Sequence, residues 1–109
     1  MMDEHVGKIA DVPEGEARRL EVAGLPVCVV NLGGKGFRAI GGLCSHAKAP
    51  LHEGEVDAED ETIECPRHGA VFDLNTGRPR SLPATVPVAA FAVRAEGDDI
   101  VMEMSRGDA

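Results

Sequence analysis

The chain has 109 residues and is acidic, with 19 Asp and Glu residues against 11 Lys and Arg residues and a net charge of -8. This charge argues against nucleic acid as a partner, because phosphate binding needs basic surfaces. The length fits one domain, residues 1–109, whose apolar core needs no disulfides. The sequence contains no apolar run of about 18 residues, the length that would predict a membrane span. The N-terminus lacks the pattern of a signal peptide. We therefore expect a cytoplasmic, unanchored monomer.

The first half of the chain is typical of short strands separated by turns. We expect strands at residues 5–12, 17–22, 25–32 and 37–40. Residues 25–32 form a continuous apolar run, which is typical of a strand covered on both faces. Gly41 and Gly42 allow a sharp bend directly after the fourth strand.

The second half continues the same pattern. We expect strands at residues 51–56, 61–64, 71–73, 88–96 and 99–103, followed by a frayed tail at 104–109. Thirteen glycines and seven prolines interrupt the chain often, and helical periodicity is almost absent. This pattern predicts an all-β protein, an antiparallel sandwich or open barrel.

Two short segments carry residues that bind metals. The first is Cys44-Ser45-His46 and the second is Cys65-Pro66-Arg67-His68, with eighteen residues, 47–64, between them. Each segment offers one thiolate and one imidazole. Two loops brought together would therefore present two ligands of each kind, the set found in a Rieske centre.

This pair of motifs, with Pro66 and Gly69 in the second loop, resembles the Rieske ferredoxin family. The resemblance covers residues 5 to 103. It implies a Rieske-like β-sandwich with a small cluster-binding subdomain at about 43–73. It also implies a Rieske-type 2Fe-2S cofactor in which Cys44 and Cys65 bind one iron and His46 and His68 bind the other.

The same resemblance implies an electron carrier with no catalytic residues. We expect it to pass single electrons from a flavin-dependent NAD(P)H reductase to a non-haem iron, ring-hydroxylating oxygenase. Other roles stay open: a ferredoxin for iron-sulfur cluster assembly, the small subunit of a nitrite reductase, or a cluster-based redox sensor. A structural zinc site is a further alternative, because two cysteines and two histidines can enclose zinc.

The residues around the motifs indicate a low reduction potential. Rieske proteins of cytochrome bc complexes have a Ser and a Tyr after the second loop, where this chain has Ala70 and Phe72, and an extra cysteine where it has Arg67. Hydroxyl donors to the cluster sulfurs stabilise the reduced state, so their absence favours a low potential. Leu82-Pro83-Ala84 resembles the proline loop that covers the cluster in this family.

Several other residues allow more than one interpretation. Cys28 lies in an apolar run and is expected to be buried rather than to bind metal. His5 and His52 are expected to lie on the surface. Seven acidic residues fall between 53 and 64, and we interpret them as a solvated loop face or, alternatively, as a docking patch for a basic redox partner: Glu53, Glu55, Asp57, Glu59, Asp60, Glu61 and Glu64.

Overall fold

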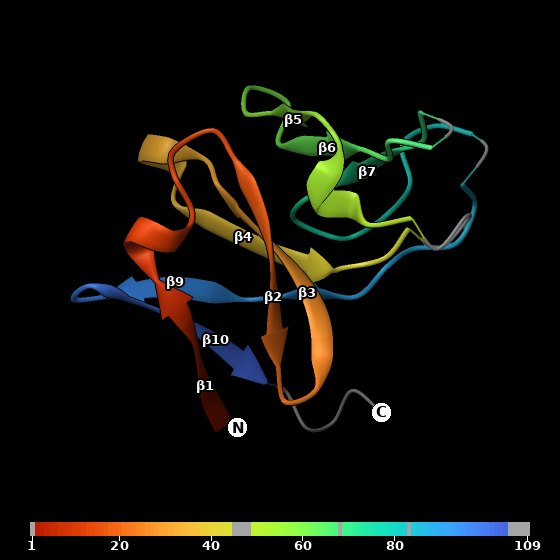
Figure 1. Ribbon diagram of the computed structural model, residues 1–109. Helices are drawn as coiled ribbons and strands as arrows, with labels where there is room; N and C mark the ends of the chain where they lie inside the picture. The colour runs from red at the N-terminus through yellow and green to blue at the C-terminus, as the bar shows by residue number, and fades with distance from the viewer. Residues whose placement is uncertain (1, 45–48, 68, 83, 105–109) are drawn as a thin grey trace.

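The computed structural model describes residues 2–44, 49–67, 69–82 and 84–104 (Figure 1). The described chain is almost entirely antiparallel β-structure, which confirms the all-β prediction. The strands are β1 (Met2–Lys8), β2 (Ala17–Val22), β3 (Leu25–Asn31), β4 (Phe37–Gly41), β5 (Val56–Asp57), β6 (Thr62–Glu64), β7 (Val71–Asp73), β8 (Ala90–Phe91), β9 (Val93–Glu96) and β10 (Asp99–Met104). Three short 3₁₀ helices connect some of them: η1 (Ile9–Asp11), η2 (Gly33–Lys35) and η3 (Leu51–Glu53).

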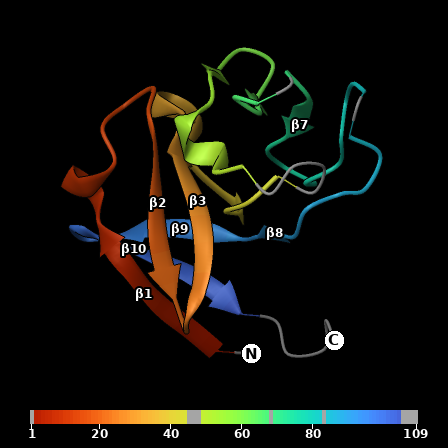
Figure 2. The same ribbon diagram turned by 45° about the vertical axis from the view of Figure 1, so that its right-hand side comes forward.

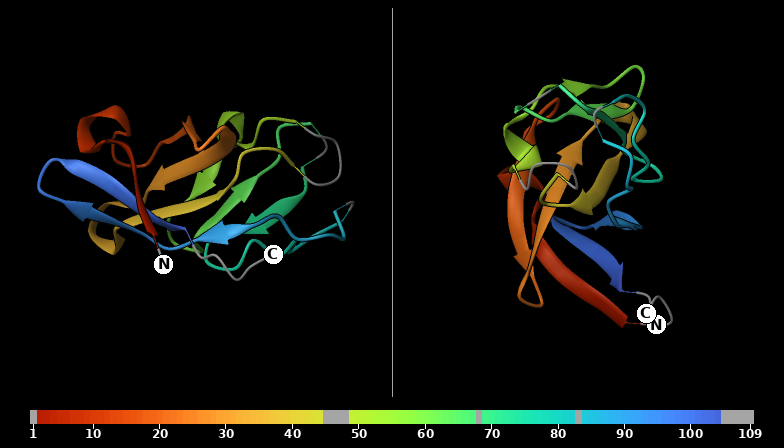
Figure 3. Two further views of the ribbon diagram at one scale, coloured as in Figure 1. Left: turned by 90° about the horizontal axis from the view of Figure 1, so that it is seen from below. Right: turned by 90° about the vertical axis from the view of Figure 1, so that its right-hand side faces the viewer.

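The strands form three sheets. One has the order β1-β10-β9, the second β2-β3-β4-β8 and the third β5-β6-β7. The first two sheets form the base of the molecule, and the third, here called the small sheet, lies on the opposite side from the β9–β10 turn (Figures 1 and 2). Two further views show the same arrangement in a molecule of 38 × 31 × 19 Å (Figure 3).

Strand β3 is buried on both faces. Val27 and Val29 pack into a core shared with β1 and β10, whereas Cys28 and Val30 pack into a second core shared with the small sheet. Side chains of a strand alternate between its faces, so a strand between two cores needs an unbroken apolar run. The prediction from residues 25–32 is thus confirmed for Val27 to Val30, whereas Leu25 is exposed and the strand ends at Asn31.

Three predicted strands are wrong in part. The strand expected at 5–12 begins at Met2, ends at Lys8 and continues as η1, where the Lys8 N–H donates to the Asp11 carboxylate at 2.9 Å. The segment 51–56 begins with η3 rather than a strand, and only Val56 joins β5. The segment 88–96 divides into β8 and β9, because the former pairs with β4 and the latter with β10.

Candidate cluster-binding site

The two cysteines of the motif begin loops closed by the same backbone contact. The Cys44 N–H donates to the Ala49 carbonyl at 2.8 Å, and the Cys65 N–H donates to the Ala70 carbonyl at 2.6 Å. In both loops the acceptor lies five residues after the cysteine. Equal loop closures place the two cysteines in equivalent positions, as a site built from two similar halves requires.

The first loop leaves β4 through Gly42. The Gly42 N–H donates to the Pro26 carbonyl at 3.0 Å, and the Gly42 carbonyl accepts from the Leu51 N–H at 3.0 Å. A Cβ at position 42 would lie 2.9 Å from the carbonyl carbon of Pro26. Only glycine therefore lets the chain turn so close to β3, in agreement with the predicted bend.

The second loop lies between β6 and β7. The Gly69 N–H donates to the Cys65 carbonyl at 3.1 Å, and Gly69 has a φ of +78°, a conformation that favours glycine. At the base of β6, the Glu64 N–H donates to the Glu55 carbonyl at 2.9 Å. Gly54 packs directly against the Glu64 carbonyl oxygen, where a Cβ would collide. Strand β6 is thereby held in place before Cys65.

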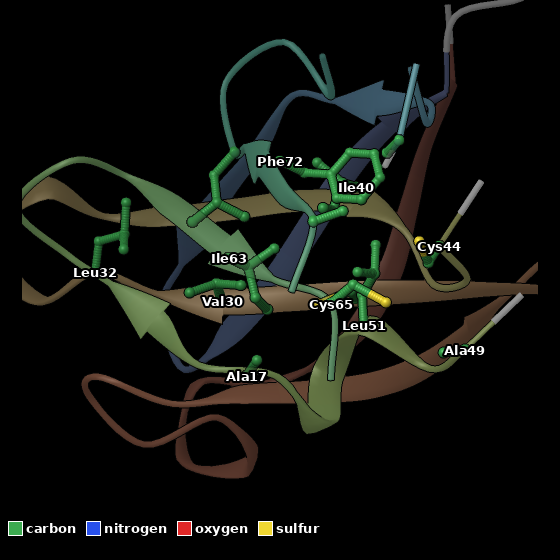
Figure 4. Close-up of a cluster of buried hydrophobic side chains, with 14 residues drawn as sticks. Ala17, Val30, Leu32, Ile40, Cys44, Ala49, Leu51, Ile63, Cys65 and Phe72 are labelled. Atoms are coloured by element: carbon green, nitrogen blue, oxygen red, sulfur yellow. The ribbon is translucent and has the colours of Figure 1, made fainter. Parts of the chain in front are cut away.

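Both cysteine side chains are buried, each with 1% of its surface exposed. Figure 4 shows them at one end of a group of buried apolar side chains, with Leu32 at the other end. A buried thiolate is unfavourable unless a cation compensates its charge. Two cysteines gathered at one end of an apolar core therefore fit thiolate ligation of a metal centre. Within the described ranges no group of three or more metal-binding side chains occurs, and His46 and His68 lie outside those ranges.

Cys28 is buried on β3, as expected from the sequence. Burial raises the pKa of its thiol to about 12, because the interior disfavours the charged thiolate. At neutral pH this side chain is a neutral thiol that packs as a small apolar residue. Cys28 is thus distinct from the two cysteines that begin the loops.

Ala70 and Phe72, the two positions compared above with a Ser and a Tyr, carry no hydroxyl group that could donate to a cluster. Ala70 and Phe72 are fully buried, and Phe72 pairs with Ile63 of β6. Beyond them, the Ser81 hydroxyl accepts from the Val71 N–H at 3.0 Å. The Arg80 N–H also donates to the Val71 carbonyl, at 2.6 Å. These contacts of Arg80 and Ser81 hold the segment before Leu82 against β7, and the sequence pattern did not predict them.

Leu82 and Ala84 of the predicted proline loop lie in opposite environments, since Leu82 is 77% exposed and Ala84 is buried. Pro83 lies outside the described residues. Leu43, next to Cys44, and Val86 are also exposed apolar side chains. Leu25 is also exposed, and single exposed apolar side chains are normal on a protein surface, so exposure alone does not assign a contact with a partner.

The acidic stretch is not uniform. Glu61 is partly buried and lies 3.1 Å from the Arg38 guanidinium, whereas the other six acidic side chains of the stretch are exposed. Four of the exposed carboxylates line a groove of about 470 Å³ beside β5 and β6: Glu55, Asp57, Asp60 and Glu64. The solvated-face interpretation therefore holds for most of the stretch but is wrong for Glu61.

The two histidines outside the motif differ. His5 is exposed, as expected, and its Nε2 atom lies 3.2 Å from the Asp99 carboxylate. His52 is half-buried on η3, and its Nδ1 atom is buried without a hydrogen-bond partner. The surface interpretation is therefore wrong for the inner edge of His52.

No helix in the described ranges is long and apolar enough to cross a membrane.

Comparison with known proteins identifies the family. Residues 4–92 match the Rieske [2Fe-2S] domain. The chain is 44% identical, over 88% of both lengths, to a 3-phenylpropionate/cinnamic acid dioxygenase ferredoxin subunit of Shigella flexneri. Its fold matches the ferredoxin of carbazole 1,9a-dioxygenase from Nocardioides aromaticivorans, with a TM-score of 0.86, 37% identity and coverage of 94% of this chain and 97% of that one.

A further solved structure contains a ferredoxin together with an oxygenase. It is a complex of reduced oxygenase and oxidised ferredoxin in carbazole 1,9a-dioxygenase. The matched chain has a TM-score of 0.80 and 35% identity, over 92% of this chain and 91% of that one. A chain of this fold thus forms a complex with an oxygenase.

Proposed function

The chain belongs to the Rieske [2Fe-2S] family and is an electron carrier of an oxygenase system, and we propose that it takes single electrons from a flavin-dependent NAD(P)H reductase and delivers them to a ring-hydroxylating, non-haem iron oxygenase. The observation that supports this most is the pair of buried cysteines on two loops of equal closure. The chain is a carrier rather than the catalytic component, and its cofactor is a Rieske-type 2Fe-2S cluster.

We propose that Cys44 and Cys65 bind one iron through their sulfurs and that His46 and His68 bind the other. The burial of the two cysteines supports this assignment, because the apolar core excludes water from the sulfur side of the site. When bound, a cluster with this ligand set exchanges one electron at a higher potential than a cluster with four cysteines. The burial of Ala70 and Phe72, neither of which offers a hydroxyl, favours the low end of the Rieske range.

The surface beside the site has two properties that suit a transient electron-transfer complex. Leu43, next to Cys44, and Leu82 are exposed apolar side chains, and the β5–β6 region before Cys65 is strongly acidic. Apolar contacts can form a small interface core, while charges increase the rate of encounter with a basic partner. A net charge of -8 also disfavours self-association, which supports the proposed monomer.

The named relatives are dioxygenase ferredoxin subunits. This similarity favours the oxygenase role over cluster assembly, nitrite reduction, redox sensing or a structural zinc site. Likeness to the small subunit of a nitrite reductase, at 16% identity, concerns the fold alone.

The test is single-turnover electron transfer. The holoprotein is reduced by one electron, mixed anaerobically with an oxidised ring-hydroxylating oxygenase, and followed by its visible absorption. We expect rapid reoxidation of the carrier and reduction of the oxygenase in equal amounts. A second experiment with NADH and a flavin reductase should reduce the carrier. Cluster signals that persist unchanged with several such oxygenases would contradict the proposal.

A further inference from the structure

Three side chains form a closed hydrogen-bonded group where the small sheet meets the base. The Arg38 guanidinium donates to Glu61 Oε1 at 3.1 Å and to Asn75 Oδ1 at 2.7 Å, and the Asn75 amide donates to the same Glu61 oxygen at 2.9 Å. Lys35 Nζ lies 3.5 Å from the other carboxylate oxygen. We call these four residues the polar clasp.

Within the polar clasp, Arg38 and Glu61 are partly buried, whereas Lys35 and Asn75 are exposed. The side chains of Arg38 and Glu61 are 25% and 23% exposed, so the pair is screened less than a typical surface ion pair. The pKa of Glu61 lies below its usual value, because the Asn75 amide and then the Arg38 guanidinium stabilise the carboxylate more than partial burial disfavours it. The pair is therefore charged on both sides at neutral pH.

The polar clasp lies where the two strands that lead to the cysteine loops begin. Arg38 is on β4, which leads in six residues to Cys44, and Glu61 directly precedes β6, which leads in four residues to Cys65. Leu32, close in sequence to Lys35, lies at the end of the buried group away from the cysteines (Figure 4). The clasp thus joins the two strands that carry the cysteines at the end remote from them.

Lys35 of the clasp also donates to the Ala58 and Glu59 carbonyls, at 2.8 and 3.2 Å, and so ties η2 to the β5–β6 turn. The Arg38–Glu61 pair is the contact that runs from β4 itself to the residue before β6. The two strands belong to different sheets and do not pair with each other. Between them lie apolar side chains such as Ile40 and Ile63. Apolar packing is non-directional, whereas a guanidinium bonded to both a carboxylate and an amide defines one relative position.

Glu61 combines an unusual backbone conformation with the contact to Arg38. Glu61 has a φ of +58°, in the left-handed region that glycine adopts more readily, and its carbonyl accepts from the Leu74 N–H at 2.9 Å. What Glu61 supplies and glycine cannot is the carboxylate. The position therefore retains a less favourable backbone residue together with the contact to Arg38.

We propose that Arg38 and Glu61 are positioning residues that fix the spacing between β4 and β6, and with it the spacing between the Cys44 and Cys65 loops. This inference rests on the cluster of the proposed function and not on the identity of the reductase or oxygenase. When the clasp is broken, the loops sample a wider range of separations. The cluster is then released faster, and its paramagnetic reduced state becomes more heterogeneous.

The test compares variants of the holoprotein. Glu61→Gln removes the charge with little change in shape, and Arg38→Met removes the guanidinium while keeping the apolar stem. Iron release to a ferrous chelator is measured far below the unfolding midpoint. We expect about fivefold faster release for each variant, as for loss of one sheltered, hydrogen-bonded ion pair. The double variant should be no faster than either single variant, because both break the same contact.

The matched control is Arg94→Met. Arg94 lies on β9 and pairs with Asp3 and Glu96, in the sheet away from the small sheet. We expect its release rate to stay within twofold of the parent. The EPR spectrum of the reduced protein should broaden in the Arg38 and Glu61 variants and not in the control. Parent-like release and linewidths in both clasp variants, or an equal acceleration in the control, would overturn the inference. Neither measurement involves a partner protein, so its failure leaves the oxygenase proposal standing.

Discussion

The Arg80 guanidinium donates to the Asp73 carboxylate at 3.3 Å and to the Asp60 carbonyl at the same distance. Asp73 ends β7, and Arg80 precedes the segment that contains Leu82. One side chain thus ties that segment to both β7 and the turn before β6. The region around the second loop is therefore fixed from its outer side as well as from the polar clasp.

Asp73 is expected to make the protein sensitive to acid. Partial burial raises the pKa of this carboxyl. Hydrogen bonds from the Asn75 and Thr76 backbone N–H groups and from Arg80 lower the pKa by more than burial raises it. The pKa in the folded protein therefore lies below its usual value of about 4. The stabilisation is therefore complete above pH about 4 and is lost as the pH falls through the folded pKa. Asp73→Ala should lower the free energy of unfolding at pH 7 by about 1–2 kcal/mol, measured with urea. A loss that is unchanged at pH 3 would contradict this explanation.

Cys65→Ser should abolish the cluster spectrum. The serine hydroxyl is a poor substitute for a thiolate, so we expect loss of visible absorption and of most bound iron. Cys28→Ala is the matched control, because it removes an equally buried sulfur that packs as a neutral thiol. It should leave the spectrum intact and cost about 1–2 kcal/mol of stability through the small cavity. Retention of full iron content in Cys65→Ser would contradict the ligand assignment.

The midpoint potential is expected near the bottom of the Rieske range of about -150 to +300 mV. Phe72→Tyr would introduce a hydroxyl donor in the second loop region and should raise the midpoint by tens of millivolts, because such donors stabilise the reduced state. Phe91→Tyr, on β8 of the base, is the control and should leave the potential unchanged. Voltammetry of the three proteins provides the measurement. A parent midpoint above zero would rule out the low-potential assignment.

Electron transfer to the oxygenase should slow as salt is added. The exposed carboxylates of the acidic groove would attract a basic partner, and salt screens that attraction. Glu55→Gln combined with Glu64→Gln should reduce both the second-order rate constant and its salt dependence. Asp98→Asn combined with Glu96→Gln removes the same number of charges at the exposed β9–β10 turn on the other side of the molecule, and should change neither by more than a small amount. Equal effects of both changes would point to total charge rather than to the groove.

The sequence predicted those elements whose pattern is local. Strands β2 and β7 have the predicted limits, and burial of β3 on both faces follows from its unbroken apolar run. The strand expected at 51–56 was wrong because Leu51–Glu53 form a short 3₁₀ helix after Pro50, and in this segment only Leu51 and Val56 are apolar. Apolar content alone does not separate these possibilities over so few residues.

The candidate site also contains residues that the local sequence predicts and residues that only the fold identifies. The cysteine motif is visible because its ligands recur at short spacing, and the burial of both cysteines agrees with it. Glu61, in contrast, is one of seven acidic residues in its stretch, and its partners Arg38 and Asn75 lie 23 and 14 residues away. Only the arrangement of strands β4, β6 and β7 distinguishes it from its exposed neighbours.

The division of the interior by β3 has a consequence for how the protein matures. The core beneath Val27 and Val29 is completed by β1 and β10, and none of the described residues of the two cysteine loops belongs to it. We therefore expect this core to form without iron and sulfide. The second core, on the Cys28 and Val30 face, includes Cys44 and Cys65, so we expect it to depend on the cofactor.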